Sequence, residues 1–294
     1  MAAMTALPQR LFKSTWTTLK ILARNKAGFL GFVMFVSLLL MSFIGPLIVP
    51  PEVQADTTAI NGSPTADHPL GTNFQGHDNL VMVVYGGREV LVVAFTAGIL
   101  TVLIAISFGA FSAYLGGWVD TLLMSITDTW LTLPRAIILY VLATLVELDS
   151  INALGIFLAL FSWPGLARQI RSQILSLKKR EYVEAAVLLD LGTPHIVFRE
   201  MLPSMMSFIA IALIDAMKVA IYQQVSLVFL GAVPFGSGWS TVFYSAYAKN
   251  AQYQADAAWS LIAPMGAIIL FQLSLVLFSR SLEEVFNPRL RVGV

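Results

Sequence analysis

Six long, mostly apolar runs alternate with polar segments along the chain. A helix needs about 20 predominantly apolar residues to cross about 30 Å of hydrocarbon, and each run approaches or exceeds that length. Four runs carry no charge, and the other two contain two charged residues each. We therefore predict an all-α integral membrane protein with six transmembrane helices. The runs cover residues 27–51, 90–119, 121–146, 151–167, 204–232 and 259–279.

Composition supports this class and excludes others. Hydrophobic residues make up 57% of the 294 residues, charged residues only 12%, and the mean hydropathy is +0.77. Soluble domains carry about 25% charged residues. A net charge of +1 gives no basic field that would attract nucleic acid. The absence of cysteine from the sequence excludes disulfides, thiolate metal sites and a thiol nucleophile.

Lysine and arginine gather in alternate polar segments. Residues 1–26 hold five, residues 168–203 hold six and residues 280–294 hold three, whereas residues 52–88 and 233–258 together hold two. Basic residues concentrate on the cytoplasmic side of membrane proteins. We therefore expect both termini and segment 168–203 to be cytoplasmic, and segments 52–88 and 233–258 to be extracellular.

The N-terminal segment, residues 1–26, is expected to be a cytoplasmic amphipathic helix. Arg10, Lys13, Lys20 and Arg24 share one stripe with Thr17, opposite an apolar side that could lie on the inner leaflet. An ordinary basic topology signal is compatible with the same pattern. The apolar run that follows is too long for a cleaved signal peptide. Residues 27–294 are then expected to form one transmembrane domain.

Residues 181–204 form a short, interrupted apolar segment on the expected cytoplasmic side. Residues 182–191 span about 15 Å as a helix, half of what a membrane requires, and their apolar side chains cover nearly the whole circumference. Gly192 is expected to end this helix, and Thr193-Pro194 to begin a second one. We call residues 181–204 the knob. Either the bundle covers one side and a partner the other, or the loop folds entirely against its own bundle.

The knob resembles the EAA loop of ABC importer permeases, the coupling helix that docks on an ATPase subunit. Glu184-Ala185-Ala186 followed by Leu202-Pro203 matches that pattern. The family places glycine where this chain has Asp190, and glycine follows two residues later. The resemblance implies an ATPase-coupling site at Glu184, Ala185, Ala186, Asp190, Gly192, Leu202 and Pro203.

Further motifs resemble the oligopeptide, dipeptide and nickel permeases, in particular the shorter, C-type subunit of a heterodimeric pair. They are His68-Pro69-Leu70-Gly71-Thr72-Asn73, Gly76-His77-Asp78, Tyr85-Gly86, Gly116-Gly117-Trp118-Val119-Asp120, Leu133-Pro134, Ser226-Leu227, Phe229-Leu230-Gly231 and Asn287-Pro288-Arg289-Leu290. The resemblance implies the type I importer permease fold in a bacterial or archaeal plasma membrane.

The same resemblance implies several partners. They are a homologous second permease, two ABC ATPase subunits and an extracellular solute-binding protein that delivers di- or oligopeptides. The sequence has no Gly-Lys dipeptide and hence no Walker A loop, so we expect ATP and Mg on the ATPases and neither a cofactor nor a catalytic residue on this chain. Oligosaccharides or nickel chelates are alternative cargoes. An ATPase-independent secondary transporter and a non-transporting scaffold are the rival classes.

Four charges inside the apolar runs are costly in lipid, about 2.5 to 3.5 kcal/mol each unless paired or wet. Internal salt bridges and a role lining the pathway are equally compatible with them. Asp215 and Lys218 can pair within one helix, and an Arg135–Asp215 contact across helices is a further hypothesis. Two glutamines in the fifth run suggest hydrogen bonds to cargo or to the second permease. The candidate residues are Asp128, Arg135, Asp215, Lys218, Gln223 and Gln224.

Asp67-His68 and His77-Asp78 are potential metal ligands in the expected outer loop. Both pairs fall inside the motifs that resemble the permease family, where histidine is favoured as a turn or interface residue. We therefore expect no metal site.

Overall fold

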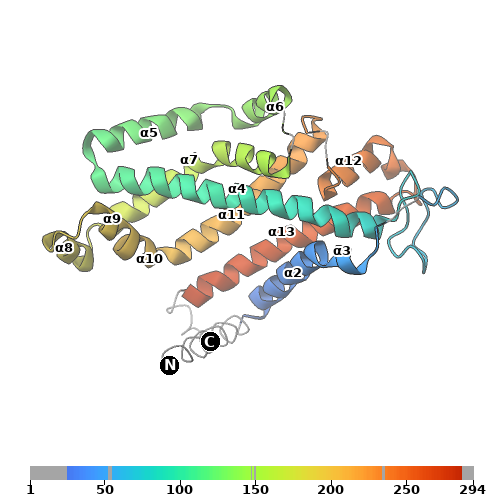
Figure 1. Ribbon diagram of the computed structural model, residues 1–294, viewed down its shortest axis with the longest axis horizontal. Coiled ribbons are helices and arrows are strands. Elements are labelled where there is room, and N and C mark those ends of the chain that lie inside the picture. Colours follow the sequence, from blue (N-terminus) through green and yellow to red (C-terminus); the bar gives the residue numbers. More distant parts are fainter. Residues whose placement is uncertain (1–24, 52–54, 147, 149, 234–235, 287–294) are drawn as a thin grey trace. The chain divides into compact units, whose positions relative to one another are not determined.

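The computed structural model describes residues 25–51, 55–146, 148, 150–233 and 236–286, and Figure 1 shows it as a ribbon. Regular structure in these residues is helical, apart from one isolated β-bridge between Thr72 and Asp78. The predicted amphipathic N-terminal segment and the motif at 287–290 lie outside the described residues. The chain divides into two compact units, residues 1–38 with 269–294, and residues 39–268, which are described separately.

In the first unit, residues 26–38 of helix α2 (Lys26–Phe43) pack against the part of helix α13 (Trp259–Phe286) that follows residue 268. A side chain at Gly28 would overlap Ser281, and one at Gly31 would overlap Leu277, so the two glycines let the helices approach closely. Phe35 stacks on Phe278, with ring centroids 5.8 Å apart. Both helices are long and apolar enough to cross a membrane, as the first and last runs predict.

The second unit is built around helix α4 (Asn79–Leu115), whose 37 residues extend about 55 Å. Its main packing partners are α7 (Ile151–Leu177) and α11 (Met206–Phe229). The α4 helix begins within segment 52–88, eleven residues before the apolar run at 90–119, because the Asp78 carboxylate caps it by accepting from Leu80 N at 2.6 Å.

The third predicted span is not one continuous helix. Helix α5 (Gly117–Thr132) and helix α6 (Arg135–Leu145) are bent by 85° at the residues between them. Pro134 lacks the N–H that would continue the helix, and it forces Leu133 into an extended conformation (φ −70°, ψ 135°). Among the described residues, five helices are long and apolar enough to span a membrane, and six spans result if this bent pair counts as one.

Helix α7 is longer than its apolar run. It continues past residue 167 to Leu177, so Arg168 and Arg171 are helical rather than part of a loop. The knob follows as α8 (Glu181–Leu188), α9 (Thr193–His195), the π-helix η1 (Ile196–Met201) and α10 (Leu202–Ser204). Near the beginning of α4, at the end opposite the knob, helix α12 (Trp239–Ala248) and the 3₁₀ turn η2 (Ala251–Tyr253) also belong to this unit.

Candidate functional site

Helix α8, the first helix of the knob, ends in a Schellman motif. Leu191 N donates to Ala186 O at 3.3 Å and Asp190 N donates to Val187 O at 3.0 Å, the two bonds that define this helix end. Asp190 adopts a left-handed conformation with φ +52°. It thus occupies the backbone geometry that glycine favours, at the position where the permease pattern has glycine. The turn has not moved to Gly192.

Gly192 adopts φ +73° and ψ 150° and immediately precedes α9. This region of backbone space is essentially restricted to glycine. No atom lies within 4 Å of a Cβ built there, so the requirement for glycine is conformational rather than steric. The prediction that Gly192 ends the first helix is therefore wrong. Asp190 closes α8, and Gly192 sets the direction of the second helix.

One face of the knob packs on its own bundle. Val183 is fully buried and Ala186 is 4% exposed. They belong to an apolar cluster that includes Ile170 and Ile174 of α7 and Met201 of η1. The small side chain of Ala186 allows α8 to lie close to this cluster. The expectation that the bundle covers one side of the knob is met at these residues.

The opposite face of the knob is apolar and exposed. Leu188 is 87% exposed and Leu189 is 70% exposed, and α8 lies at one extreme end of the second unit (Figure 1). Glu184 and Ala185 are also exposed. Complete packing against the bundle, the alternative left open by the sequence, is wrong for this face. The exposed apolar residues of the knob are Tyr182, Val187, Leu188, Leu189, Leu191 and Phe198.

The knob joins α11 through an irregular helical segment. Pro203 has no N–H to donate to the carbonyl four residues earlier, and its ring crowds that carbonyl. The wider π-helical turn η1 directly precedes Leu202-Pro203. Leu202 is half-buried and Pro203 is exposed. Met205 (φ −114°, ψ 17°) then leaves helical geometry before α11 begins. The predicted site residues at 202–203 therefore lie at the junction between the knob and α11.

Two ion pairs connect α5 with α7. Arg171 bonds both carboxylate oxygens of Asp120, with Nε to Oδ1 at 2.7 Å and Nη2 to Oδ2 at 2.5 Å. Arg168 Nε donates to Asp128 at 2.9 Å, so Asp128 does have a salt bridge, but not with Arg135. Neither pair was predicted from the sequence, because hydropathy places the two arginines in a loop beyond the end of the fourth span.

Arg135 and Asp215 do not form the contact proposed from the sequence. Lys218 Nζ lies 2.6 Å from Asp215 Oδ1, one turn away on the same helix. Arg135 Nη2 instead donates to Ser162 Oγ at 2.9 Å, because the bend at Pro134 directs this side chain toward α7. The i,i+3 pair was expected, and the contact across helices is wrong.

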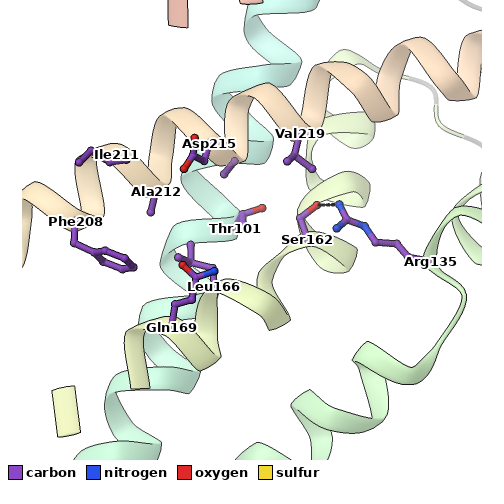
Figure 2. A pocket seen from close by; sticks show the side chains of 11 residues that line it. Thr101, Arg135, Ser162, Leu166, Gln169, Phe208, Ile211, Ala212, Asp215 and Val219 are labelled. Atoms are coloured by element: carbon purple, nitrogen blue, oxygen red, sulfur yellow. Dashed lines mark hydrogen bonds between the residues drawn. The ribbon is translucent and has the colours of Figure 1, made fainter. Parts of the chain in front are cut away.

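Arg135 and Asp215 nevertheless line one cavity of about 180 Å³ between α4, α6, α7 and α11. Figure 2 shows Arg135 and Asp215 on separate walls, with Thr101 and Ser162 also lining the space. Adjacent cavities of about 350 Å³ and 130 Å³ are lined in part by the same Arg135. Gln223 lines the larger one.

Gln224 points into the protein rather than into these cavities. Its side chain is 1% exposed, and both polar atoms of its amide lack a hydrogen-bond partner among the described residues. Gln223 Oε1 lies 3.3 Å from Ser162 Oγ. The two neighbouring glutamines therefore have different surroundings, and of the two only Gln223 lines a cavity together with Arg135.

The histidine pairs of the loop at 55–78 do not assemble a metal site. Within the described residues, no group of three or more His, Asp or Glu side chains could hold a metal ion. His68 Nδ1 lies 2.9 Å from Asp78 Oδ2. This hydrogen bond raises the pKa of His68 above its ordinary value of 6.5. His68 therefore supports the residue that caps α4.

The bundle of apolar helices, the cavities that Arg135 and a few other polar residues line, and the exposed apolar face of the knob fit a membrane transport protein. Residues 105–292 match the family described as binding-protein-dependent transport system inner membrane component. Residues 13–64 match the N-terminal TM domain of oligopeptide transport permease C. This chain belongs to the family of binding-protein-dependent transport system inner membrane components, and it is a multi-pass inner membrane protein.

Relatives extend over nearly the whole chain. A Brucella abortus protein, named as a candidate peptide permease, is 32% identical over 269 residues, 90% of this chain and 88% of the relative. The dipeptide transport system permease protein DppC of Bacillus subtilis is 28% identical, over 95% of this chain and 86% of the relative. The oligopeptide transport system permease protein OppC of Bacillus subtilis is 26% identical, over 91% and 87%.

Proposed function

We propose that this protein is a permease subunit of an ATP-driven importer that takes up di- or oligopeptides delivered by a solute-binding protein. The names of its relatives support peptides as the cargo. A homologous second permease would complete the pathway, and two ABC ATPase subunits would bind ATP and Mg. Oligosaccharides and nickel chelates remain the alternative cargoes.

The observation that carries this proposal is the exposed apolar face of α8. Leu188 and Leu189 present apolar surface at the end of the bundle. The other face of the same helix is buried at Val183 and Ala186. Burial of apolar area yields about 25 cal/mol per Å², so a partner that covers these leucines gains binding free energy. Glu184 adds a carboxylate beside them for a basic or backbone donor. A cleft of an ATPase subunit is the partner that the proposal assigns to this face.

ATP-dependent uptake in proteoliposomes tests the proposed coupling. We expect Leu188→Asp and Glu184→Arg each to abolish peptide uptake and to release the ATPase subunits on purification, while the chain still inserts with the second permease. Leu188→Met keeps an apolar side chain at the same position and should retain uptake. Normal uptake with Leu188→Asp would contradict the assignment of α8.

The energy source separates this function from a secondary transporter. An ionophore that collapses the ion gradients should leave uptake unchanged while ATP is present. Uptake that stops with the gradient at constant ATP would contradict the ATP-driven reaction. Competition between a labelled peptide and a labelled oligosaccharide, each with its own binding protein, then tests the cargo.

A further inference from the structure

Arg135 differs in its pairing from the charged residues on the neighbouring helices α5, α7 and α11. Asp120 bonds Arg171, Asp128 bonds Arg168, and Asp215 bonds Lys218. Arg135 donates only to the Ser162 hydroxyl, and its Nε is buried without a hydrogen-bond partner in the described part of the chain. No carboxylate among the described residues neutralises it.

An uncompensated cation at this depth is expensive. A charged side chain within the bilayer costs about 2.5 to 3.5 kcal/mol even on the lowest scale, and such residues commonly mark a transport pathway. A structural salt bridge does not explain Arg135, since no acidic partner is present in the described residues. Its position does suggest a role, because Arg135 is the residue that all three cavities described above share.

The surroundings of Arg135 fit an anionic, planar group. A guanidinium presents five N–H donors in a fixed fork and binds a carboxylate through two parallel hydrogen bonds. Ser162 Oγ, which also lies 2.7 Å from Leu158 O, holds the fork from the α7 side. Thr101 and Gln169 add polar groups to the cavity wall (Figure 2).

We propose that Arg135 binds the C-terminal carboxylate of a peptide as it passes between α6, α7 and α11. The inference rests on the proposed function, because a peptide supplies a carboxylate at one end whatever its side chains are. Ser162 acts as a positioning residue that aims the guanidinium. Asp215 on the other wall is paired with Lys218 behind it, which offsets the repulsion between Asp215 and an anion.

The test compares a peptide that has a free C-terminus with the same peptide as its C-terminal amide. Initial uptake rates are measured in proteoliposomes of the complete transporter, at equal concentrations of binding protein loaded with each peptide. Because the binding protein is loaded in advance, its own affinities for the two peptides do not affect the ratio of the rates. We expect the wild type to carry the free acid about tenfold faster than the amide, because the neutral amide has only one acceptor oxygen and cannot form the bidentate ion pair that a carboxylate forms with a guanidinium.

Three variants then locate the preference. Arg135→Gln should bring the two uptake rates to within about twofold of each other. We expect this because uptake of the free acid slows, whereas uptake of the amide does not change. Arg135→Lys keeps the charge without the fork, so an intermediate ratio is expected. Ser162→Ala should lower the ratio about threefold in an assembled complex of normal thermal stability. Arg88→Gln removes an exposed arginine near the start of α4 and should leave the ratio unchanged.

Several results would overturn the assignment. Equal rates for both peptides in the wild type would do so, as would an equal loss of both rates with Arg135→Gln. Rescue of Arg135→Glu by a reversed charge on the second permease would show that Arg135 pairs with that subunit. If the complete transporter carries neither peptide, the proposed peptide cargo fails; if it carries both at one rate, only the role of Arg135 fails.

Discussion

The Glu89 carboxylate holds the beginning of α12, and its removal is the perturbation with the best-defined consequence. Glu89 lies in α4 and is 6% exposed. Its Oε2 accepts from Ser237 N and Gly238 N, both at 2.9 Å. Trp239 Nε1 donates to Val83 O at 2.6 Å beside them. The carboxylate therefore satisfies two backbone donors at a helix N-terminus, where negative charge is also favourable.

The cost of Glu89→Ala follows from these contacts. Each backbone N–H left buried without a partner costs about 1 to 3 kcal/mol, and relief of the buried carboxylate offsets part of the sum. We expect a net loss of about 2 to 4 kcal/mol. A change of 1 kcal/mol moves the unfolding midpoint of a chain of 150 to 250 residues by about 2 to 4 °C. The apparent midpoint of the purified protein should therefore fall by about 4 to 16 °C.

A double-mutant cycle with Gly238→Ala sharpens this prediction. A Cβ at position 238 would lie 2.7 Å from Glu89 Oε1, so Gly238→Ala alone should also destabilise. Glu89→Ala removes the atoms that this methyl group would meet. The loss in the double variant should therefore be smaller than the sum of the two single losses by about 1 kcal/mol or more. Additive losses, or an unchanged midpoint in Glu89→Ala, would refute the proposed contact.

Three further predictions concern other parts of the chain. Asp190→Gly should stabilise the knob by about 0.5 to 1 kcal/mol, because glycine adopts φ +52° without strain; slower hydrogen exchange in α8 would show it. The bond between His68 and Asp78 raises the pKa of His68, so its contribution to stability is complete below pH 6.5 and is lost as pH rises through the higher folded value. His68→Gln should remove this dependence from thermal unfolding curves. Gly31→Leu would overlap Leu277 and should lower the unfolding midpoint by weakening the α2–α13 packing, whereas an unchanged midpoint would contradict that contact.

Hydropathy predicted the order of the membrane helices, and their number if the bent pair α5–α6 counts as one span, but it did not predict their ends. The run at 90–119 begins eleven residues after the start of α4, because a helix starts at its cap, Asp78, whether or not the first turns are apolar. The bend at Leu133-Pro134 was readable from the proline, since it interrupts backbone hydrogen bonding inside an apolar run. Its angle of 85° depends on packing against α7 and α11, which hydropathy does not describe.

The pairing of charges was the least predictable part of the site. Asp215 and Lys218 are neighbours on one helix, so their spacing alone indicated the bond. Asp120 and Arg171 lie on different helices, and their contact requires α7 to extend beyond its apolar run. The exposed face of α8 was one of the two alternatives that its apolar circumference left open, and the exposure of Leu188 and Leu189 decides between them.

The junction at Pro203 connects the two parts of the proposed mechanism, the knob that binds the ATPase and the cavity that α11 lines. Helix α11 is continuous from Met206 to Phe229, so a rotation at its first residue reaches the cavity wall at Asp215 and Gln223 without a hinge in between. The knob side of this junction is the π-helical turn η1, a rare helical form that occurs frequently at functional sites. In the proposed mechanism, a partner bound to Leu188 displaces this junction, which acts as a hinge, and the unbroken α11 carries the displacement toward the cavity. If this is correct, stiffening the junction should uncouple ATP hydrolysis from uptake without weakening ATPase binding. Pro203→Ala, which restores the missing N–H, is the variant that tests it. Unchanged uptake per ATP hydrolysed in that variant would place the moving element elsewhere.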